Sequence, residues 1–150
     1  EMSASLVGSE MCIRDSGITD AVKANFDSYV WDFSKDEENI EKSAAANIGI
    51  VHGEYGLAES GGIVLFATKD NGRSTSLLPT TSIVVVRKSK VLPRVAQLAQ
   101  ILHEKAQAGE RMPSCINIIS GPSATADIEL IKVVGVHGPV SKIYVVIDDL

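Results

Sequence analysis

Short aliphatic runs alternate with helix-like segments along this chain, and no other feature of the sequence constrains the fold as strongly. The most apolar runs cover residues 63–67, 83–86 and 143–147. They have the length of buried strands and are far shorter than the roughly 20 residues that span a bilayer. Strands that alternate with helices are typical of an α/β domain. At 150 residues, the chain has the length of one domain.

Local patterns predict the individual elements. Ser34 stands three residues before Glu37, and this capping-box spacing predicts a helix to about Ala46. Ile40 and Ala44 are expected on the buried side of that helix. Further helices are expected at residues 93–109 and 125–131, and strands at residues 29–33, 48–51, 61–67, 82–87, 115–119 and 143–147.

A chain reversal is predicted at Asp70-Asn71-Gly72, because Asn and Gly tolerate positive φ. The reversal leads the chain into residues 73–78, and Pro79 ends that element. It adds an antiparallel pair to the parallel pairs expected of crossover connections. We therefore expect a mixed sheet.

The composition argues against several classes of protein. Hydrophobic residues make up 45% and charged residues 22% of the chain, as in ordinary soluble domains. The net charge of −5 argues against a nucleic-acid-binding protein, because neutralising phosphates needs a basic surface. Two cysteines form no disulfide scaffold and favour the reducing cytoplasm. No CxxC, HxxxH or HExxH spacing occurs, so the sequence predicts no metal site.

Residues 1–16 differ from the rest, since they show neither helical nor strand periodicity and lack the apolar core of a signal peptide. The stretch LVGSEMCIRD at residues 6–15 matches the translation of a transposon-end sequencing adapter. We interpret residues 1–16 as adapter-derived and residues 17–150 as the folded domain. This interpretation predicts an N-terminally truncated domain in which Cys115 is the single cysteine.

The segment Ser120-Gly121-Pro122-Ser123 follows an expected strand and precedes an expected helix. Such a junction presents free backbone N–H groups to an anion. Asp127 in the first turn of that helix would stabilise the helix dipole and repel a phosphate. A ligand cradle and a well-capped helix therefore stay open as interpretations of these residues.

A second candidate is the turn Gly135-Val136-His137-Gly138-Pro139, in which two glycines and a proline surround a histidine. A constrained turn of this kind can aim an imidazole into a cleft. A lone histidine is nevertheless more often a structural residue than a base.

A third candidate is Glu59-Ser60-Gly61, a carboxylate beside backbone that a ligand can approach closely. Arg73 and Ser76 add a cation and a hydroxyl just after the predicted reversal. Open α/β sheets bind ligands at the ends of their strands. We therefore expect these loops to converge in one pocket.

Several of these motifs together resemble the LUD-domain family, in its branch of lactate-utilisation protein C. The two most specific stretches are SGPSATADIE at residues 120–129 and GVHGP at residues 135–139. The others are AESGGIVL at residues 58–65, GRSTSLLP at 72–79 and PSCIN at 113–117. The resemblance extends over nearly all of residues 17–150.

The resemblance implies a Rossmann-like, three-layer α/β fold with a mixed sheet, of the NagB/RpiA/CoA-transferase type. It implies a role in the oxidation of L-lactate to pyruvate, together with two iron–sulfur partner proteins. Iron–sulfur clusters are accordingly expected in the partners and no cofactor in this chain, which has no cysteine cluster to ligate one.

The first hypothesis is a non-redox subunit that binds a small carboxylic acid such as lactate, or binds the iron–sulfur partners. Arg73 would hold the carboxylate bidentately. Ser123 and the N–H groups after Gly121 would hold the other end, and His137 would accept the proton of the 2-hydroxyl.

Two alternatives belong to other classes of function. Glu-Ser-Gly resembles the turn in which CoA-transferases carry a nucleophilic glutamate, so Glu59 would form an acyl intermediate in a stand-alone acyl- or CoA-handling enzyme. The other alternative is a regulatory domain that senses a small acid without converting it.

Overall fold

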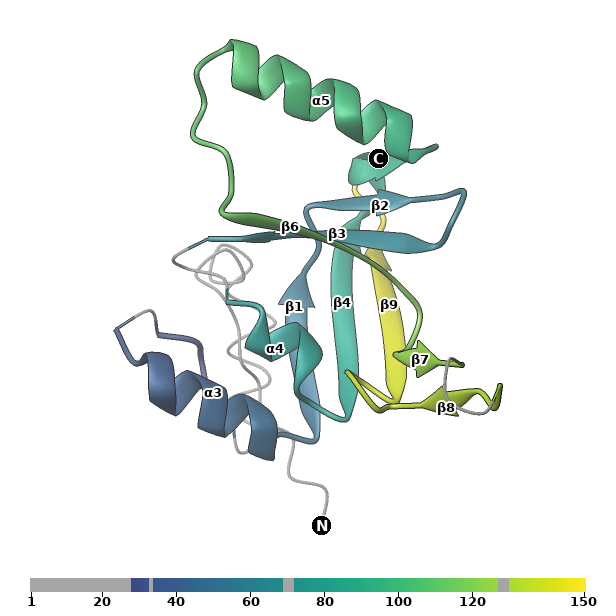
Figure 1. Cartoon of the computed structure of the whole chain (residues 1–150). Helices are drawn as coiled ribbons and strands as arrows, with labels where there is room; N and C mark the ends of the chain where they lie inside the picture. The colour runs from purple at the N-terminus through teal and green to yellow at the C-terminus, as the bar shows by residue number, and fades with distance from the viewer. Residues whose placement is uncertain (1–27, 33, 69–71, 127–129) are drawn as a thin grey trace.

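The computed structural model describes residues 28–32, 34–68, 72–126 and 130–150, and its longer strands form two sheets that cross one another (Figure 1). The first sheet is entirely parallel, with strand order β1-β4-β9. Its strands are β1 (Ile48–His52), β4 (Thr81–Arg87) and β9 (Ser141–Ile147). All three are β-branched runs with apolar side chains on both faces, which is typical of parallel strands.

The second sheet is mixed, with strand order β5-β2-β3-β6. β3 pairs antiparallel with β2 and β6, and β5 pairs parallel with β2. The strands are β2 (Tyr55–Leu57), β3 (Gly62–Ala67), β5 (Val91–Leu92) and β6 (Cys115–Ser120). A separate two-stranded ribbon joins β7 (Ala124–Thr125) to β8 (Val133–Val134).

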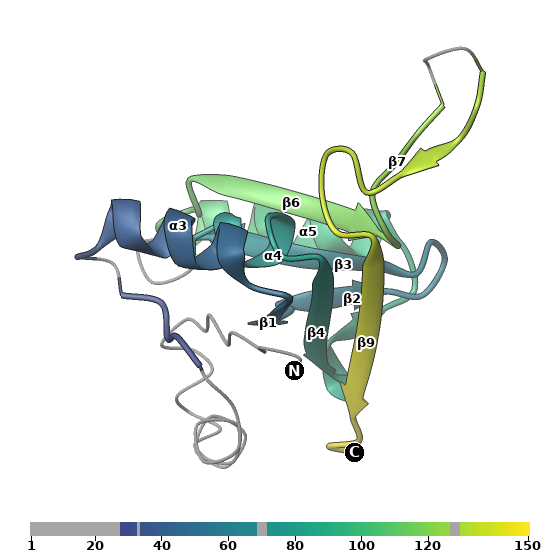
Figure 2. The ribbon, with the colours of Figure 1, turned by 90° about the horizontal axis from the view of Figure 1, so that it is seen from below.

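The helices form two groups. α3 (Asp36–Ala45) and the short α4 (Ser74–Leu77) lie next to one another beside β1, and α5 (Val95–Gln107) covers the outer side of the mixed sheet (Figures 1 and 2). A 3₁₀ turn, η1 (Lys88–Lys90), follows β4. In the described part of the chain, the layers are therefore α5, the mixed sheet and the parallel sheet.

Two apolar clusters hold these layers together. The first joins the two sheets and consists of Val51, Ile63, Leu65, Val84 and Val86, with Ile119 packed against it. The second joins the mixed sheet to α5 and consists of Leu57, Val64 and Leu98, with Tyr55, Phe66, Leu92, Leu102 and Ile116 packed against it. The core is aliphatic, as the low aromatic content of 5% requires.

Most long elements agree with the sequence prediction. The strands expected at 48–51, 61–67, 82–87, 115–119 and 143–147 correspond to β1, β3, β4, β6 and β9. The helix expected at 93–109 corresponds to α5, which begins at Val95 and is followed by Gly109 at φ 74°. Glycine adopts this left-handed conformation without strain and so terminates the helix.

The expected mixed sheet is present, but a separate parallel sheet accompanies it, so the strands divide between two sheets. The antiparallel pairs come from β2, β3 and β6. The turn Asp70-Asn71-Gly72 does not supply one: residues 74–77 form α4, while residues 69–71 lie outside the described residues. β2 and β5, with three and two residues, are too short for a sequence pattern to indicate.

The start of the chain also differs from its prediction. Residues 29–32 form no strand; instead the Asn39 side chain binds this segment, accepting from the Tyr29 hydroxyl and the Asp32 N–H and donating to the Asp32 carbonyl. The capping box is absent as well, since Ser34 Oγ donates to an Asp32 carboxylate oxygen at 2.7 Å.

The buried face of α3 is polar, contrary to its predicted apolar stripe. Asn39 and Ser43 are buried, whereas Ile40 is 54% exposed and Ala44 is also exposed. Ser43 Oγ donates to Ser74 Oγ of α4 at 3.4 Å. Helix α3 thus docks through hydrogen bonds, which an apolar periodicity cannot indicate.

The helix expected at 125–131 is not formed by the described residues of that segment. Thr125 pairs with Val133 in the β7–β8 ribbon, and Leu130 has φ 57°, outside the helical region. Residues 127–129, and with them Asp127, lie outside the described residues.

Candidate functional site

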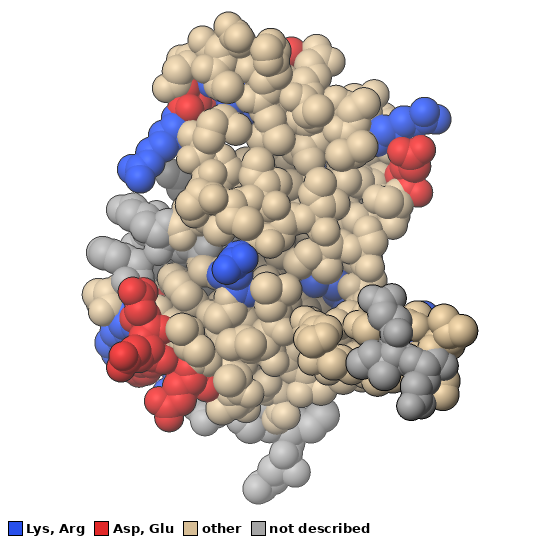
Figure 3. All heavy atoms as spheres, viewed as in Figure 1, with Lys and Arg blue, Asp and Glu red and all other residues tan. Residues whose placement is uncertain are grey.

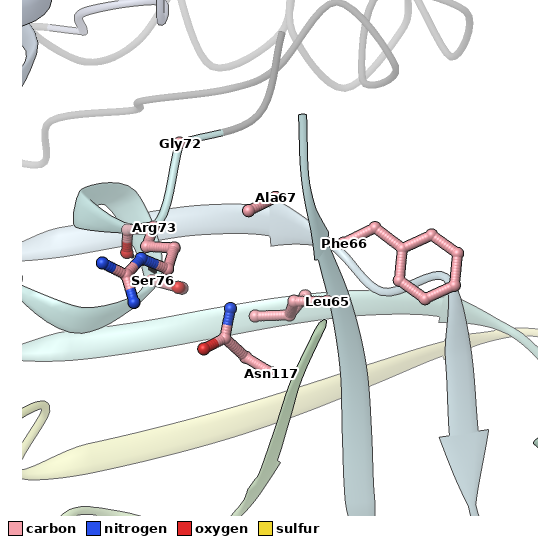
Figure 4. A pocket seen from close by; sticks show the side chains of 7 residues that line it. All are labelled: Leu65, Phe66, Ala67, Gly72, Arg73, Ser76 and Asn117. Atoms are coloured by element: carbon pink, nitrogen blue, oxygen red, sulfur yellow. Dashed lines mark hydrogen bonds between the residues drawn. The ribbon is translucent and has the colours of Figure 1, made fainter. Parts of the chain in front are cut away.

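A small pocket lies between α4 and the mixed sheet, at the end of β3 that leads toward α4. It is shallow and partly open to solvent, and it is lined by Leu65, Phe66, Ala67, Gly72, Arg73, Ser76 and Asn117. Figure 4 shows the side chains of Arg73 and Ser76 on one side and the amide of Asn117 directed toward them from the other. The pocket brings together Arg73 and Ser76, two of the residues predicted from the sequence.

Local packing fixes the start of α4. A Cβ atom at Gly72 would overlap the indole ring of Trp31, so only glycine lets the chain pass this close to the tryptophan. Arg73 follows at once as the N-cap residue of α4. Ser76 is buried, and its hydroxyl donates to the Arg73 carbonyl at 3.0 Å. The backbone of Arg73 is therefore held while its guanidinium stays exposed.

The polar groups of this pocket are mainly donors. The Asn117 carbonyl oxygen Oδ1 accepts from Cys115 Sγ at 3.8 Å, which orients the amide nitrogen as a donor. The Arg73 guanidinium adds up to five N–H donors. None of the described residues that line the pocket is acidic. A guanidinium beside an amide N–H suits a carboxylate, which accepts only.

The two glycine-rich motifs meet at the other end of α4. The Ser123 N–H donates to the Pro139 carbonyl at 3.0 Å, and the Gly135 N–H donates to the Ser123 carbonyl at 2.9 Å. A Cβ at Gly138 would lie 3.2 Å from Ser123 Cβ and 3.8 Å from the carbonyl oxygen of Leu77. The motifs thus form one unit that contacts the last residue of α4.

The anion cradle predicted for the Ser120–Ser123 segment loses its structural basis. Ala124 and Thr125, where its helix is expected to begin, form β7, and the Gly121 N–H donates to the Tyr144 hydroxyl at 2.8 Å. The Ser123 N–H is likewise bound to Pro139, and Pro122 has no N–H. His137 and Pro122 are exposed at this junction. The binding roles proposed for these side chains remain predictions.

Glu59, Ser60, Gly61 and Ser120 form a third group, at the opposite end of β3. Gly62 pairs with Ser120 there, whereas Leu65 pairs with Asn117 near the pocket. The Glu59 carboxylate is exposed and lies 3.8 Å from the Arg94 guanidinium nitrogen Nε. Ser60 Oγ accepts from the Gly62 N–H at 3.2 Å. The structure therefore does not bring these four residues together with Arg73, and an acyl-transfer role of Glu59 stays a prediction.

Sequence patterns did not single out three polar residues that the fold places near these motifs. Asn117 lies inside an apolar strand, and that interruption is the signal that could have indicated it. Tyr144 binds Gly121, and Lys142 lies two residues before it on β9. Burial lowers the pKa of the Lys142 ammonium below its ordinary value. Their positions depend on strand register, which the sequence alone does not fix.

The described residues show no cluster of three or more His, Cys, Asp or Glu side chains suited to hold a metal ion. None of the helices in that part of the chain is long and apolar enough to cross a membrane.

The two crossed sheets and their helices define a mixed α/β protein. The pocket lined by hydrogen-bond donors, at one end of α4, is its candidate anion site. The LUD domain family matches residues 2–147, so the chain belongs to the LUD domain family. That match includes most of residues 1–16, which lie outside the described residues; their adapter origin remains a prediction.

Several proteins are similar to this chain in sequence. Uncharacterized protein YkgG of Escherichia coli K12 is 57% identical over 144 residues, or 96% of this chain and 62% of its own length. Lactate utilization protein C of Bacillus subtilis 168 is 54% identical over 119 residues, covering 79% of this chain and 50% of its own. The Bacillus licheniformis protein of the same name is 52% identical, with the same coverage. The chain thus spans between 50% and 62% of the length of these relatives.

A crystal structure of a DUF162 family protein from Deinococcus radiodurans has the same fold. The TM-score is 0.56 at 18% sequence identity, and the match covers 96% of this chain and 87% of that one.

Proposed function

We propose that this chain belongs to a lactate-utilisation system, in which it binds a small carboxylic acid such as lactate without itself carrying the redox centre. Two relatives that are 52% and 54% identical bear the name lactate utilization protein C. The observation that carries the binding proposal is the donor-lined pocket formed by Arg73 and Asn117. The charge and the donors fit a carboxylate.

In this proposal the guanidinium of Arg73 binds the carboxylate through two parallel N–H···O bonds. The amide nitrogen of Asn117 donates to a carboxylate oxygen or to the 2-hydroxyl. α4 has four residues and is about 6 Å long at a rise of roughly 1.5 Å per residue. The glycine-rich motifs that carry His137 and Ser123 lie at the other end of α4. We assign His137 to the proton of the 2-hydroxyl and Ser123 to a hydrogen bond at that end of the acid.

Oxidation of lactate to pyruvate releases two electrons and two protons, so the reaction needs an electron acceptor. We assign that role to two iron–sulfur partner proteins. His137 would accept the proton of the 2-hydroxyl, and the hydrogen on C2 would leave with the two electrons to the partner proteins. We further propose that the fold is a form of the NagB/RpiA/CoA-transferase type; an experimental structure of a full-length relative would test this assignment.

Lactate binding by Arg73 variants tests the function. We expect Arg73→Ala to weaken binding about tenfold or more, because a charge-assisted pair is lost. Arg73→Lys should bind with intermediate affinity, because it keeps the charge and loses the bidentate geometry. Arg111→Ala is the matched control, since Arg111 is exposed and lies outside the pocket.

Titration calorimetry with L-lactate measures these affinities, and growth on lactate of cells that carry a full-length Arg73→Ala protein measures the role in vivo. Unchanged binding by Arg73→Ala would remove this pocket from the function. Normal growth of those cells would remove Arg73 from lactate utilisation.

A further inference from the structure

Ser82 and Lys142 lie side by side at the centre and edge of the parallel sheet. The register pairs Gly49 of β1 with Ser82 of β4, and Ser82 with Lys142 of β9. Paired residues of neighbouring strands point their side chains to the same face. A Cβ at Gly49 would meet the carbonyl of Thr75 and the ring of Pro79. Ser82 and Lys142 therefore face the side of the sheet that α4 covers.

Each of the two side chains ends in a buried polar atom that has no partner in the described part of the chain. Ser82 is completely buried, and its Oγ has no hydrogen-bond partner among the described residues. The Lys142 ammonium nitrogen Nζ is buried and unpartnered in the same way. Burying an unpaired charge or hydroxyl destabilises a fold, and nearly all such groups in proteins have partners. Two of them in adjacent register positions therefore call for an explanation.

No described carboxylate forms an ion pair with Lys142, and burial is the one cause that lowers its pKa. The space-filling view shows basic atoms near the centre of this face, above α4 and over β4 (Figure 3). The acidic atoms visible there lie over α3 and toward the upper and right-hand edges.

We propose that Lys142 and Ser82 form an anion-binding subsite beneath α4, which takes the carboxylate or phosphate group of a small molecule. The ammonium donates to one oxygen of the anion, and the Ser82 hydroxyl donates to a second. A bound anion gives both buried atoms the partner that they lack. The Lys142 residue as a whole is partly exposed, although its nitrogen Nζ is buried.

This subsite does not depend on the Arg73 pocket. Neither Ser82 nor Lys142 lines that pocket, whose walls are α4, through Arg73 and Ser76, and the mixed sheet, through Asn117. An Arg73→Ala protein should therefore keep the Lys142 subsite, and a Lys142 variant should keep the Arg73 pocket. Failure of one proposal leaves the other standing.

Inorganic phosphate and L-lactate are the two probes that distinguish a phosphate ligand from a carboxylate ligand. Each is titrated into the Arg73→Ala protein, so that the first pocket does not contribute, and the melting temperature and amide chemical shifts are followed. We expect saturable stabilisation by at least one probe, with shifts at Ser82, Lys142 and the neighbouring Gly49.

Lys142→Met should weaken that binding about tenfold or more, and Ser82→Ala should weaken it less, because the charge supplies the larger share. Lys142→Arg should retain part of it. Lys42→Met, at an exposed position of α3, is the control and should change nothing.

The proposal is overturned if neither probe binds saturably, or if Lys142→Met binds as tightly as its parent. A Lys142→Met protein that melts higher and shows no difference in anion binding would assign the lysine no role as a ligand.

Discussion

β4 and β9 are neighbouring strands of seven residues with closely similar sequences, TSIVVVR and SKIYVVI, yet their burial differs sharply. Val86 and Val146 are register partners, but Val86 is 2% exposed and Val146 is 55% exposed. The next pair shows the same contrast, with 8% for Val85 and 42% for Val145. The same residue type, directly opposite in one ladder, is core in one strand and surface in the other.

The difference comes from position in the sheet. β4 lies between β1 and β9, whereas β9 has β4 as its single partner among the described strands. The mixed sheet also packs against β4 through Ile63 and Leu65. An aliphatic run therefore shows that a strand can be buried, while topology decides whether it is.

Replacing each of the two register partners, Val86 and Val146, by alanine should give the largest difference between the strands. We expect Val86→Ala to lower the free energy of unfolding by about 2 kcal/mol, from lost burial and the cavity left behind. Val146→Ala should change it by less than about 0.5 kcal/mol, as at other exposed sites. Urea unfolding with an unchanged m-value measures both.

Equal losses in the two variants would break the comparison, because they would show that β9 is covered in solution. A dependence of the Val146→Ala effect on protein concentration would then identify a second copy as the cover.

The sequence predicts the long elements of the fold well and the short or polar ones poorly, for a physical reason. The long β-branched runs identified β1, β3, β4, β6 and β9, and the spacing of Leu98 and Leu102 identified α5. These elements carry their own signal, since each depends on a period of apolar residues. The elements that were missed are two- and three-residue strands and a helix that docks through Asn39 and Ser43.

The candidate site shows the same limit. Arg73 and Ser76 were predicted from their place after an expected turn, and the pocket contains both. Asn117 reaches it because β6 pairs with β3, and Lys142 meets Ser82 because β9 pairs with β4. Such pairings join residues far apart in the chain, and no local pattern specifies them.

The Tyr144→Phe variant tests whether the exposed strand β9 positions the loop around Gly121. Its hydroxyl accepts from the Gly121 N–H at 2.8 Å, so Tyr144→Phe should cost about 1 kcal/mol and speed hydrogen exchange at Gly121. Tyr55→Phe is the control, because its ring packs on Phe66 in another part of the molecule. Unchanged exchange at Gly121 would show that β9 does not position this loop.

The Lys142→Met variant of β9 should change the stability of the fold in a pH-dependent way. Burial lowers the pKa of Lys142 in the folded chain, so the unfolded chain binds more protons between the folded pKa and the ordinary value of roughly 10.4. The loss of stability from burying the charged ammonium of Lys142 is complete at pH values below its folded pKa. It disappears as the pH rises to the ordinary pKa of lysine. We therefore expect Lys142→Met to stabilise the fold by less than about 1 kcal/mol at neutral pH.

That gain should shrink as pH is raised above neutrality. Thermal unfolding at a series of pH values follows it, with Lys42→Met as an exposed control whose effect should stay flat. A stabilisation that is independent of pH would attribute the effect to apolar packing of methionine instead.

The smallest effect is expected where the ends of the two strands are joined. Asp149, just after β9, accepts from both the N–H and the hydroxyl of Ser89 in η1, at 2.9 and 2.7 Å. These hydrogen bonds lower the pKa of Asp149, so their stabilisation is present above the ordinary aspartate value of roughly 3.9 and is lost as pH falls through the folded pKa. Asp149→Asn should therefore lower the melting temperature slightly at neutral pH and have no effect in strong acid, with Glu41→Gln on α3 as control. A drop that persists in acid would show that the carboxylate charge is not what holds the end of β9 to β4.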